Sequence, residues 1–491
     1  MIGMLLRRSF VRLSLGALVL VSCVGSETPD VDGGAGGALT AAGAGSSAGS
    51  GVGVTPTAGA GGGALAGSSS GPPGGGSGHT GGAPLGGGAG SSSSSGSGGA
   101  GGVGTPPTFT EDEGADCAVP NLPDAGALPT VAKLPNPFQK LDGSALASKA
   151  DWRCRRQELK RQAEKYVYGT KPPKPESVTG TVSDTSISVQ VTHQGKTTEF
   201  TATVSLPSSG SKPYPAIIGL KSGFFAYPID ENLVKGEGVA IIELDPYDLG
   251  AEQNASRGSK QGAFYDIYGS TSSTGLLLAW SWGVSRVIDV IADSGGSVLE
   301  ADALGISGCS RFGKGAFTIG AFDQRIALTL PIESGSGGVP IWRGIPGEGA
   351  QTPSSAYTET YWLGDAFSAF TGKVTALPID THEVVGMVAP RGLFIMDNPH
   401  IANLGPKSAH VAALGGAEIY EALGAAENIS YVSAVADGGH CGWRPEWVEP
   451  FKKAVGKFLT KTGGGAGTIA ASSKATGNLA EWREWQTPTL D

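Results

Sequence analysis

Short apolar runs recur from residue 216 to residue 435, and each ends in small or polar residues. Six of them are strand candidates: Ala216–Leu220, Val239–Leu244, Ala303–Ile306, Ile326–Leu330, Gly392–Met396 and Ile429–Val435. Continuous apolar runs are typical of strands that are buried on both faces. Helix candidates lie between them, at Gly275–Asp293, Gly313–Phe322, Lys407–Leu423 and Pro445–Leu459. This alternation predicts an α/β fold with a mostly parallel central sheet and helices on both sides.

Two different patterns precede these runs. Residues 151–168 carry apolar side chains at helical spacing, which predicts a helix from Asp151 to Tyr168. Between Thr179 and Pro207 apolar and polar residues alternate with period two. Period-two alternation is the pattern of half-buried strands, so we expect an N-terminal antiparallel hairpin there.

Composition divides the chain into a tether and a domain. Residues 23–110 are almost wholly Gly, Ala, Ser, Thr and Pro, with too little apolar bulk to offset the entropy of ordering. We therefore expect a disordered linker over 23–110 and one domain over 111–491. The formal net charge is −9, and the domain has no block of Lys or Arg. A nucleic-acid partner is therefore not expected.

The first residues resemble an export signal. Arg7, Arg8 and Arg12 precede the apolar run Leu13–Val21, which is too short to span a bilayer. The end of this run, Leu20–Cys23, resembles a bacterial lipoprotein box, which implies cleavage after residue 22 and lipidation of Cys23. Val24 after it, where Asp is absent, resembles sorting to the outer membrane. An ordinary signal peptide with an incidental cysteine is the alternative, and the segment also resembles a twin-arginine signal.

The candidate nucleophile follows the third apolar run. Ser307–Lys314 reads S-G-C-S-R-F-G-K and leads into a predicted helix. A strand, a glycine-flanked serine and a helix form the pattern of the nucleophile elbow of α/β-hydrolases, a three-layer sandwich. Amide groups at the start of that helix can stabilise an oxyanion. The pattern departs from G-x-S-x-G, because Phe312 occupies the final glycine position and Gly313 follows it. A structural turn serine is the alternative.

Six histidines are available as a base: His79, His193, His382, His400, His410 and His440. His440 follows the last predicted strand, which is where the base lies when the triad residues occur in the order Ser, acid, His. We therefore expect His440 to be the base for Ser310. A surface or core histidine is the alternative.

The cysteines support this pairing independently. Without Cys23, four remain, an even number in an exported chain, and four cysteines allow three pairings. Cys309 directly precedes Ser310, and Cys441 directly follows His440. A disulfide between them needs Cα atoms about 4.4–6.8 Å apart, so it is compatible with a Ser310–His440 dyad. Cys117 and Cys154 would then form the second disulfide.

Two acids could orient the imidazole, because both end predicted strands. Glu333 follows the strand after the nucleophile helix, and Asp397 follows the next one. The usual place of the acid in this fold favours Asp397. A metal site is not expected, since His382-Glu383 is not continued into H-E-x-x-H.

Five segments together resemble the glucuronoyl esterases, carbohydrate esterase family 15. Gly308–Ala316 is similar to the family's G-C-S-R-x-G-K-x-A motif, and Glu333–Gly338 to its E-S-G-x-G-G motif. Gly439–Cys441 resembles its histidine motif. Val388–Gly392 resembles its V-A-P-R-G segment, and Trp280–Arg286 its tryptophan helix. The resemblance extends from about Cys117 to Trp485.

The resemblance implies an activity: cleavage of esters between the (4-O-methyl-)glucuronic acid of glucuronoxylan and lignin alcohols. It implies Ser310 as nucleophile, His440 as base, Glu333 as acid and Arg311 as an oxyanion contact. Lys314, Gln351 and Glu359 would contact sugar hydroxyls. Asp397 corresponds to a second acid in some bacterial relatives, so it could share or replace the role of Glu333. The family often has Trp near residue 403, where this chain has Asn403, so a sugar-stacking contact would be missing.

A serine esterase acting through an acyl-enzyme is therefore the leading interpretation. A different carbohydrate esterase, acetyl or feruloyl, is one alternative, and a non-catalytic carbohydrate-binding lipoprotein is another. A complete Ser310, Glu333 and His440 set favours an enzyme, because a binding module needs no triad. No cofactor is expected, and we expect an exported monomer held to the outer membrane or cell surface only by its lipid.

Overall fold

The computed structural model describes residues 109–223, 227–465 and 467–491. The expected signal segment, the lipid-bearing Cys23, the Gly/Ser-rich linker up to residue 108 and His79 lie outside the described residues. In the part of the chain that is described, no helix combines the length and the apolarity needed to cross a bilayer.

One ten-stranded sheet forms the centre of the domain, in the order β1-β2-β3-β5-β4-β6-β7-β8-β9-β10. The first three strands and β5 pair antiparallel, and all the other pairs are parallel. The strands are β1 Ser177–Val182, β2 Ser186–His193, β3 Lys196–Ser205, β4 Tyr214–Leu220, β5 Ala240–Leu244, β6 Leu299–Cys309, β7 Ile326–Ile332, β8 Gly392–Met396, β9 Ile429–Val432 and β10 Ile469–Ala470.

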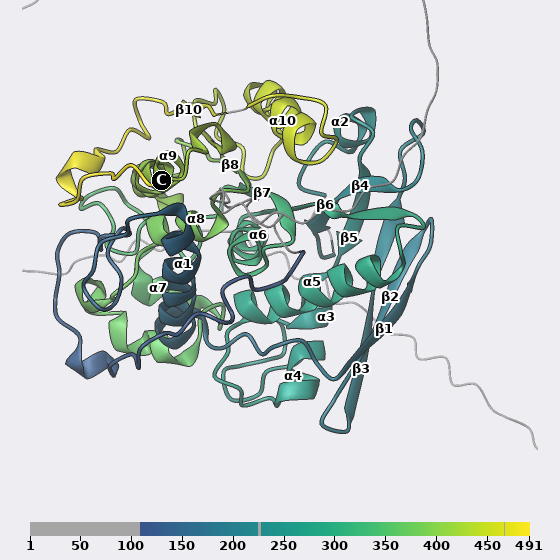
Figure 1. Cartoon of the computed structure of the whole chain (residues 1–491), viewed down its shortest axis with the longest axis horizontal. Helices are drawn as coiled ribbons and strands as arrows, with labels where there is room; N and C mark the ends of the chain where they lie inside the picture. The colour runs from purple at the N-terminus through teal and green to yellow at the C-terminus, as the bar shows by residue number, and fades with distance from the viewer. Residues whose placement is uncertain (1–108, 224–226, 466) are drawn as a thin grey trace, which may run out of the picture. The chain divides into compact units, whose positions relative to one another are not determined.

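Helices cover both faces of this sheet. They are α1 Lys149–Ala163, α2 Glu231–Gly236, α3 Pro246–Leu249, α4 Ala263–Tyr268, α5 Leu276–Asp293, α6 Arg311–Phe322, α7 Pro353–Glu359, α8 Thr381–Val388, α9 Pro406–Ala422 and α10 Pro445–Phe458. In Figure 1, α2 and α10 lie together along the upper edge of the view, while α1, α5, α6 and α8 lie in front of the sheet. The expected three-layer α/β-hydrolase fold is confirmed.

The two helical layers bury opposite sides of the same apolar strands. Ile217 and Ile241 pack with Trp447 and Phe451 of α10. Their neighbours, including Ile218, belong to the larger cluster with α5, α6, α8 and α9. Successive side chains of a strand point to opposite faces, so a continuous apolar run supplies both layers at once.

Most of the expected elements are present, with small shifts at their ends. The hairpin is longer than expected, because β1 adds a third antiparallel strand. The predicted helix over 151–168 begins at Lys149, where Ser148 and Asp151 form a capping box, and its last turn, Glu164–Tyr168, is a π-helix. The short helices α2, α3, α4 and α7 were not predicted. Each has four to seven residues, too short for helical periodicity to be recognised.

Both expected disulfides are present, Cys117–Cys154 and Cys309–Cys441. Cys117–Cys154 ties the N-terminal segment of the domain to α1. The same segment places Glu111 in a buried charged cluster, where its carboxylate pairs with Lys171 at 2.8 Å and with Arg286. The chain that follows the expected linker is therefore fixed to the domain from its first residues.

Candidate active site

Ser310 lies at the sharp turn between β6 and α6. Its backbone is left-handed, with φ 58° and ψ −124°, and its amide donates to the carbonyl of Ile332 at 2.9 Å. A Cβ on Gly308 would lie 2.3 Å from the carbonyl oxygen of Phe312, and a Cβ on Gly313 would lie 2.4 Å from that of Ile332. Gly313 therefore supplies the close approach to β7 that the tight elbow requires, although it is one position late in the motif.

Glu333 follows β7 at the same edge of the sheet and has no exposed surface. Its amide donates to the Met396 carbonyl at 2.8 Å. Its Oε2 accepts from the Cys441 amide at 2.8 Å and lies 2.6 Å from His440 Nδ1. Because the Ile332 carbonyl is bonded to the Ser310 amide, the backbone places nucleophile and acid side by side.

His440 lies on the loop between β9 and α10, and its side chain is 42% exposed. The Cys309–Cys441 disulfide holds the Cα atoms of these two cysteines 5.7 Å apart. Ser310 and His440 each adjoin one of these cysteines, so the crosslink brings them to the same place. With Nδ1 against Glu333, the ring presents Nε2 for proton exchange, as a Ser-His-acid arrangement requires.

Asp397 directly follows β8 and is buried, but its carboxylate accepts hydrogen bonds from Tyr431 and Asn398 rather than contacting His440. Its Oδ2 accepts from the Tyr431 hydroxyl at 3.2 Å, and its Oδ1 accepts from the Asn398 amide at 2.9 Å. Burial raises the pKa of Asp397 to about 7, and the nearby Glu333 charge acts in the same direction, whereas the hydrogen bonds from the Asn398 amide and the Tyr431 hydroxyl act against it. Of the two candidate acids, Glu333 is therefore the one with a direct contact to His440.

The ligating atoms of Cys309, Glu333, His440 and Cys441 all lie within 4.8 Å of one another. Such spacing would suit a metal, but the two sulfurs are joined in a disulfide. A metal-binding cysteine must be a thiolate. Only one carboxylate and one imidazole remain, so the donor set fits an acid–base pair better than a metal centre.

Two cations and an indole lie beside Ser310. Arg311 Nη1 donates to Glu252 Oε2 at 2.6 Å, and Lys314 Nζ donates to the Ser334 carbonyl at 2.6 Å. Both cations face the ring of Trp362, with Lys314 Nζ at 4.9 Å and the Arg311 guanidinium at 5.7 Å from its centroid. We call Glu252, Arg311, Lys314 and Trp362 the cation cradle.

Burial and neighbouring charges shift the pKa values of both cations of the cradle, Lys314 and Arg311. Burial lowers the pKa of Lys314 to about 8, and the neighbouring Arg311 charge acts in the same direction. Burial alone would lower the pKa of Arg311, but the carboxylate of Glu252 raises it above its usual value.

Gln351 and Glu359 lie at the rim of the cradle. Gln351 Nε2 donates to Glu359 Oε2 at 2.6 Å, and the other Glu359 oxygen lies 3.9 Å from Arg311. The Gln351 amide donates to the Asn403 carbonyl at 3.0 Å. The structure therefore gathers both predicted sugar contacts, and the position where relatives often carry Trp, on one side of Arg311.

The other four described histidines contact groups outside the candidate site. His382 is buried, bonds the Pro135 carbonyl at 3.0 Å and stacks on Trp485, and burial lowers its pKa to about 4. His410 accepts from the Gly477 amide at 3.1 Å. His400 bonds the Val435 carbonyl at 2.9 Å, and His193 lies 3.5 Å from Glu176.

Four residues of the site were missed by the sequence reasoning: Glu252, Trp362, Asn398 and Arg444. Glu252 lies on an irregular loop after α3, far from every motif, so the sequence carried no signal for it. Asn398 directly follows the candidate acid Asp397, and Arg444 lies three residues after Cys441, which was the one available signal. Asn398 Nδ2 donates to Glu333 Oε1 at 3.2 Å.

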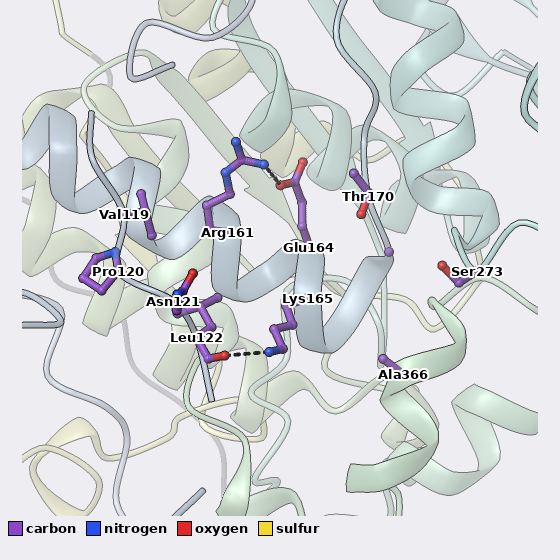
Figure 2. A pocket seen from close by; sticks show the side chains of 11 residues that line it. Val119, Pro120, Asn121, Leu122, Arg161, Glu164, Lys165, Thr170, Ser273 and Ala366 are labelled. Carbon is purple, nitrogen blue, oxygen red and sulfur yellow. Dashed lines mark hydrogen bonds and ion pairs between the residues drawn. The ribbon is translucent and has the colours of Figure 1, made fainter. Parts of the chain in front are cut away.

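A cavity of about 450 Å³ lies away from these residues, between the segment around Val119–Leu122 and the end of the first helix (Figure 2). Its cations are already paired, Arg161 with Glu164 at 3.2 Å and Lys165 with the Leu122 carbonyl at 2.6 Å. None of the proposed site residues lines it, so its volume does not identify it as the active site. A smaller cavity of about 290 Å³ is lined in part by Gln351, at the rim of the cradle, and by none of the four cradle residues.

A serine at a strand-to-helix elbow, and an acid and a histidine after later strands of a parallel sheet, define a hydrolase of the α/β-hydrolase class. The family model described as "Glucuronyl esterase, fungi" matches residues 189–424. The 4-O-methyl-glucuronoyl methylesterase of Hypocrea jecorina is 37% identical over 383 residues, which cover 77% of this chain and 80% of that protein.

Solved structures agree. A variant glucuronoyl esterase of Sporotrichum thermophile, in complex with methyl 4-O-methyl-β-D-glucopyranuronate, is 34% identical with a TM-score of 0.69, over 76% of this chain and all of that one. A carbohydrate esterase family 15 enzyme of Caldicellulosiruptor kristjansonii is 28% identical with a TM-score of 0.63, over 74% of this chain and 99% of that one. The chain belongs to the glucuronoyl esterase family and is a carboxylic-ester hydrolase.

Proposed function

We propose that the protein hydrolyses ester bonds between the (4-O-methyl-)glucuronic acid of glucuronoxylan and lignin alcohols. The observation that carries this proposal is the 2.6 Å contact between Glu333 and His440, held beside Ser310 and the cation cradle. A uronate ester offers hydroxyls and a carbonyl oxygen, and the cradle offers the matching donors. The relative solved with a methyl glucuronate supports the same substrate class.

The reaction we propose proceeds through an acyl-enzyme. His440 Nε2 takes the proton of Ser310 as its oxygen attacks the uronate carbonyl, and later donates that proton to the departing alcohol. Water then attacks the acyl carbon and gives a proton to His440, and His440 returns that proton to the Ser310 oxygen as the bond between the acyl group and Ser310 breaks and the glucuronate leaves. Glu333, ionised against the ring, holds the imidazole in its tautomer and stabilises the imidazolium.

The cradle has two separate tasks in this proposal. Arg311 follows the nucleophile directly and stabilises the oxyanion, which develops only in the transition state. Lys314 binds sugar hydroxyls through several donors. Gln351 and Glu359 add contacts at the rim. Because Asn403 stands where relatives often carry Trp, recognition here depends on polar contacts more than on stacking.

The substrate class can be tested by competition between ester types. We expect hydrolysis of a benzyl glucuronate ester with a kcat/KM at least about 100-fold above that for a feruloyl ester or acetylated xylan, because a site built from buried polar donors rejects substrates that leave them unpaired. Preference for the acetyl or feruloyl ester would contradict the proposal.

The identity of the acid can be tested separately. Glu333→Gln should lower kcat by about 10²- to 10⁴-fold, the range for a loss of acid–base function. Asp397→Asn should leave kcat within about threefold of wild type, since its contacts lead to Tyr431. A loss of activity confined to Asp397→Asn would transfer the role to that residue.

We infer further that the chain is exported and anchored by lipid on Cys23, with residues 23–110 as the tether of the 111–491 domain. The two disulfides support export, because disulfides persist in oxidising compartments. In a bacterial host, incorporation of labelled palmitate should disappear in Cys23→Ala. Labelling that persists in this variant would contradict the anchor. A monomer at micromolar concentration is expected by light scattering.

A further inference from the structure

The loop that carries His440 is held at both ends by one buried side chain. Arg444 directly precedes α10, and its side chain is 1% exposed. One of its terminal nitrogens donates to the carbonyl of Gly439, and the other donates to the carbonyl of Gly442. These two carbonyls bracket His440 and Cys441, so the guanidinium spans the loop from one side of the catalytic residue to the other.

The same guanidinium reaches the acid. Arg444 Nη2 lies 3.4 Å from Glu333 Oε1, while the second oxygen, Oε2, contacts His440. Asn398 Nδ2 is the other group that bridges this carboxylate and the loop, at 3.2 Å from Glu333 Oε1 and 3.3 Å from the Gly439 carbonyl. The acid Glu333 and the loop that carries His440 are therefore held by the same two side chains, Arg444 and Asn398.

We propose that Arg444 is the positioning residue of this active site, which fixes the Gly439–Gly442 loop and the side chain of Glu333 in one geometry. The inference rests on the proposed roles of Ser310, His440 and Glu333. It concerns a residue that touches neither substrate nor the reacting atoms and acts through His440 and Glu333.

Two physical reasons favour this role. Two glycines flank His440 and Cys441, and glycine leaves the backbone free to adopt many conformations, so the loop needs an external restraint to hold the imidazole. Misplacement of a catalytic group by about 1 Å can cost about 100-fold in rate. A carboxylate as buried as Glu333 also needs a nearby cation or hydrogen-bond donors to replace the water that it has lost.

The role requires arginine rather than positive charge alone. A planar guanidinium has separate donors that can reach two carbonyls and a carboxylate at once, whereas an ammonium is a point charge. Arg444→Lys therefore keeps the charge and loses the bridge across the loop. Arg444→Gln loses both.

Arg444 also has contacts that a purely structural residue would have. Its guanidinium lies 5.1 Å from the Trp447 ring and 3.2 Å from the exposed carboxylate of Asp437. Arg391 provides the matched control, because its guanidinium also donates to backbone carbonyls, those of Asp323, Gly320, Ile326 and Met387, away from the site.

The experiment compares kcat, KM and Tm of the full chain on a benzyl glucuronate ester. We expect Arg444→Gln to lower kcat about 100-fold and Arg444→Lys about 10-fold or more, with KM within about threefold of wild type. Arg391→Lys should lower Tm by a similar amount and keep kcat within about threefold. An inactive wild type would contradict the proposed function, not this role.

Wild-type kcat in folded Arg444→Gln, or an equal loss in Arg391→Lys, would overturn the proposal. A rise in KM without a fall in kcat would overturn it too, because that pattern signals lost substrate binding. If neither Arg444 variant folds, Asp437→Ala decides. It removes the exposed partner of Arg444 and the acceptor of the Gly439 amide at 2.8 Å. A kcat lowered threefold or more would support the role, and a smaller change would overturn it.

Discussion

Three residues of the site have left-handed backbones: Ser310 at φ 58°, Glu333 at 46° and Cys441 at 62°. Such conformations cost about 1–3 kcal/mol each for residues with side chains, and they persist only where the surrounding structure imposes them. Here the imposing contacts are visible, namely the bond of Ser310 to the Ile332 carbonyl, that of Glu333 to Met396, and the Cys309–Cys441 crosslink. These backbone conformations form the sharp turns that bring the three residues together.

Glu252 should matter to turnover although no motif contains it. Its carboxylate holds Arg311 at 2.6 Å and accepts from the Trp362 indole and, at 3.0 Å, from the Tyr247 hydroxyl. We expect Glu252→Gln to lower kcat/KM about 10- to 100-fold, the value of a hydrogen bond between charged groups. Steady-state kinetics on a benzyl glucuronate ester will measure it.

A matched control for Glu252 lies one element away. Glu243 pairs with Lys221 at 2.8 Å on β5, and Glu243→Gln removes the same charge outside the cradle. It should leave kcat/KM unchanged. Equal effects of the two substitutions would mean that Glu252 acts only through general charge or stability.

Lys314 should make substrate binding depend on pH. Burial lowers its pKa to about 8, so the ammonium is fully protonated well below pH 8 and is lost as the pH rises through that value. We therefore expect KM for the glucuronate ester to rise above pH 8. Lys314→Met should have a KM raised about 10-fold or more, with no further rise in this range. A wild-type KM that is flat between pH 7 and 9 would contradict this assignment.

Asp397 should reduce stability when ionised. Burial raises its pKa to about 7 from 3.8, so the folded state holds a proton that the unfolded state has lost between about pH 4 and 7. Stability therefore falls as the pH rises through this window. Asp397→Asn should raise Tm by about 2–4 °C at pH 8 and have little effect near pH 4. The exposed control Asp302→Asn should give no such pH-dependent difference, and a lower Tm for Asp397→Asn at pH 8 would contradict the account.

At the scale of elements, the two disulfides have different tasks. Cys309–Cys441 joins the end of β6 to the histidine loop, whereas Cys117–Cys154 joins the N-terminal segment to α1. Replacing both cysteines of the second pair by Ala should cost about 3–4 kcal/mol of stability, from a separation of 37 residues. It should leave kcat unchanged, because no site residue depends on that segment.

Replacing both cysteines of the Cys309–Cys441 pair should instead lower kcat, since the loop of His440 then loses a covalent tie to the nucleophile elbow. A fall of about 10-fold or more in kcat, with KM little changed, is the expected outcome. If the two pairs of substitutions affect Tm and kcat alike, the Cys309–Cys441 disulfide has no separate catalytic task.

Elements were predictable from the sequence wherever a pattern was long. The predicted apolar runs correspond to β4 to β9. They were recognisable because parallel strands that are buried on both faces consist mostly of apolar residues. The five predicted long helices were also found. Short helices such as α3, with four residues, carry too few positions for periodicity. The third antiparallel strand, β1, was not distinguished from the predicted hairpin, because only one of its six residues, Val178, is buried.

At the scale of the molecule, the site gathers residues from positions 252 to 444 at one edge of the sheet. Motifs pointed to Ser310, His440 and both candidate acids, since Ser310, Glu333 and Asp397 each directly follow a strand and His440 lies on the loop after β9. They could not choose between Glu333 and Asp397, because both lie at strand ends and only the path of each side chain distinguishes them. Glu252 and Arg444 required the structure, since their roles come from contacts between distant segments.

Hydrolysis of a benzyl glucuronate ester by the wild-type chain and by Ser310→Ala tests the central claim most directly. We predict turnover by the wild type and a loss of about 10⁴-fold or more in kcat/KM for Ser310→Ala, the scale set by removing a catalytic serine. Hydrolysis by Ser310→Ala at the wild-type rate, or none by the wild type, would contradict the account.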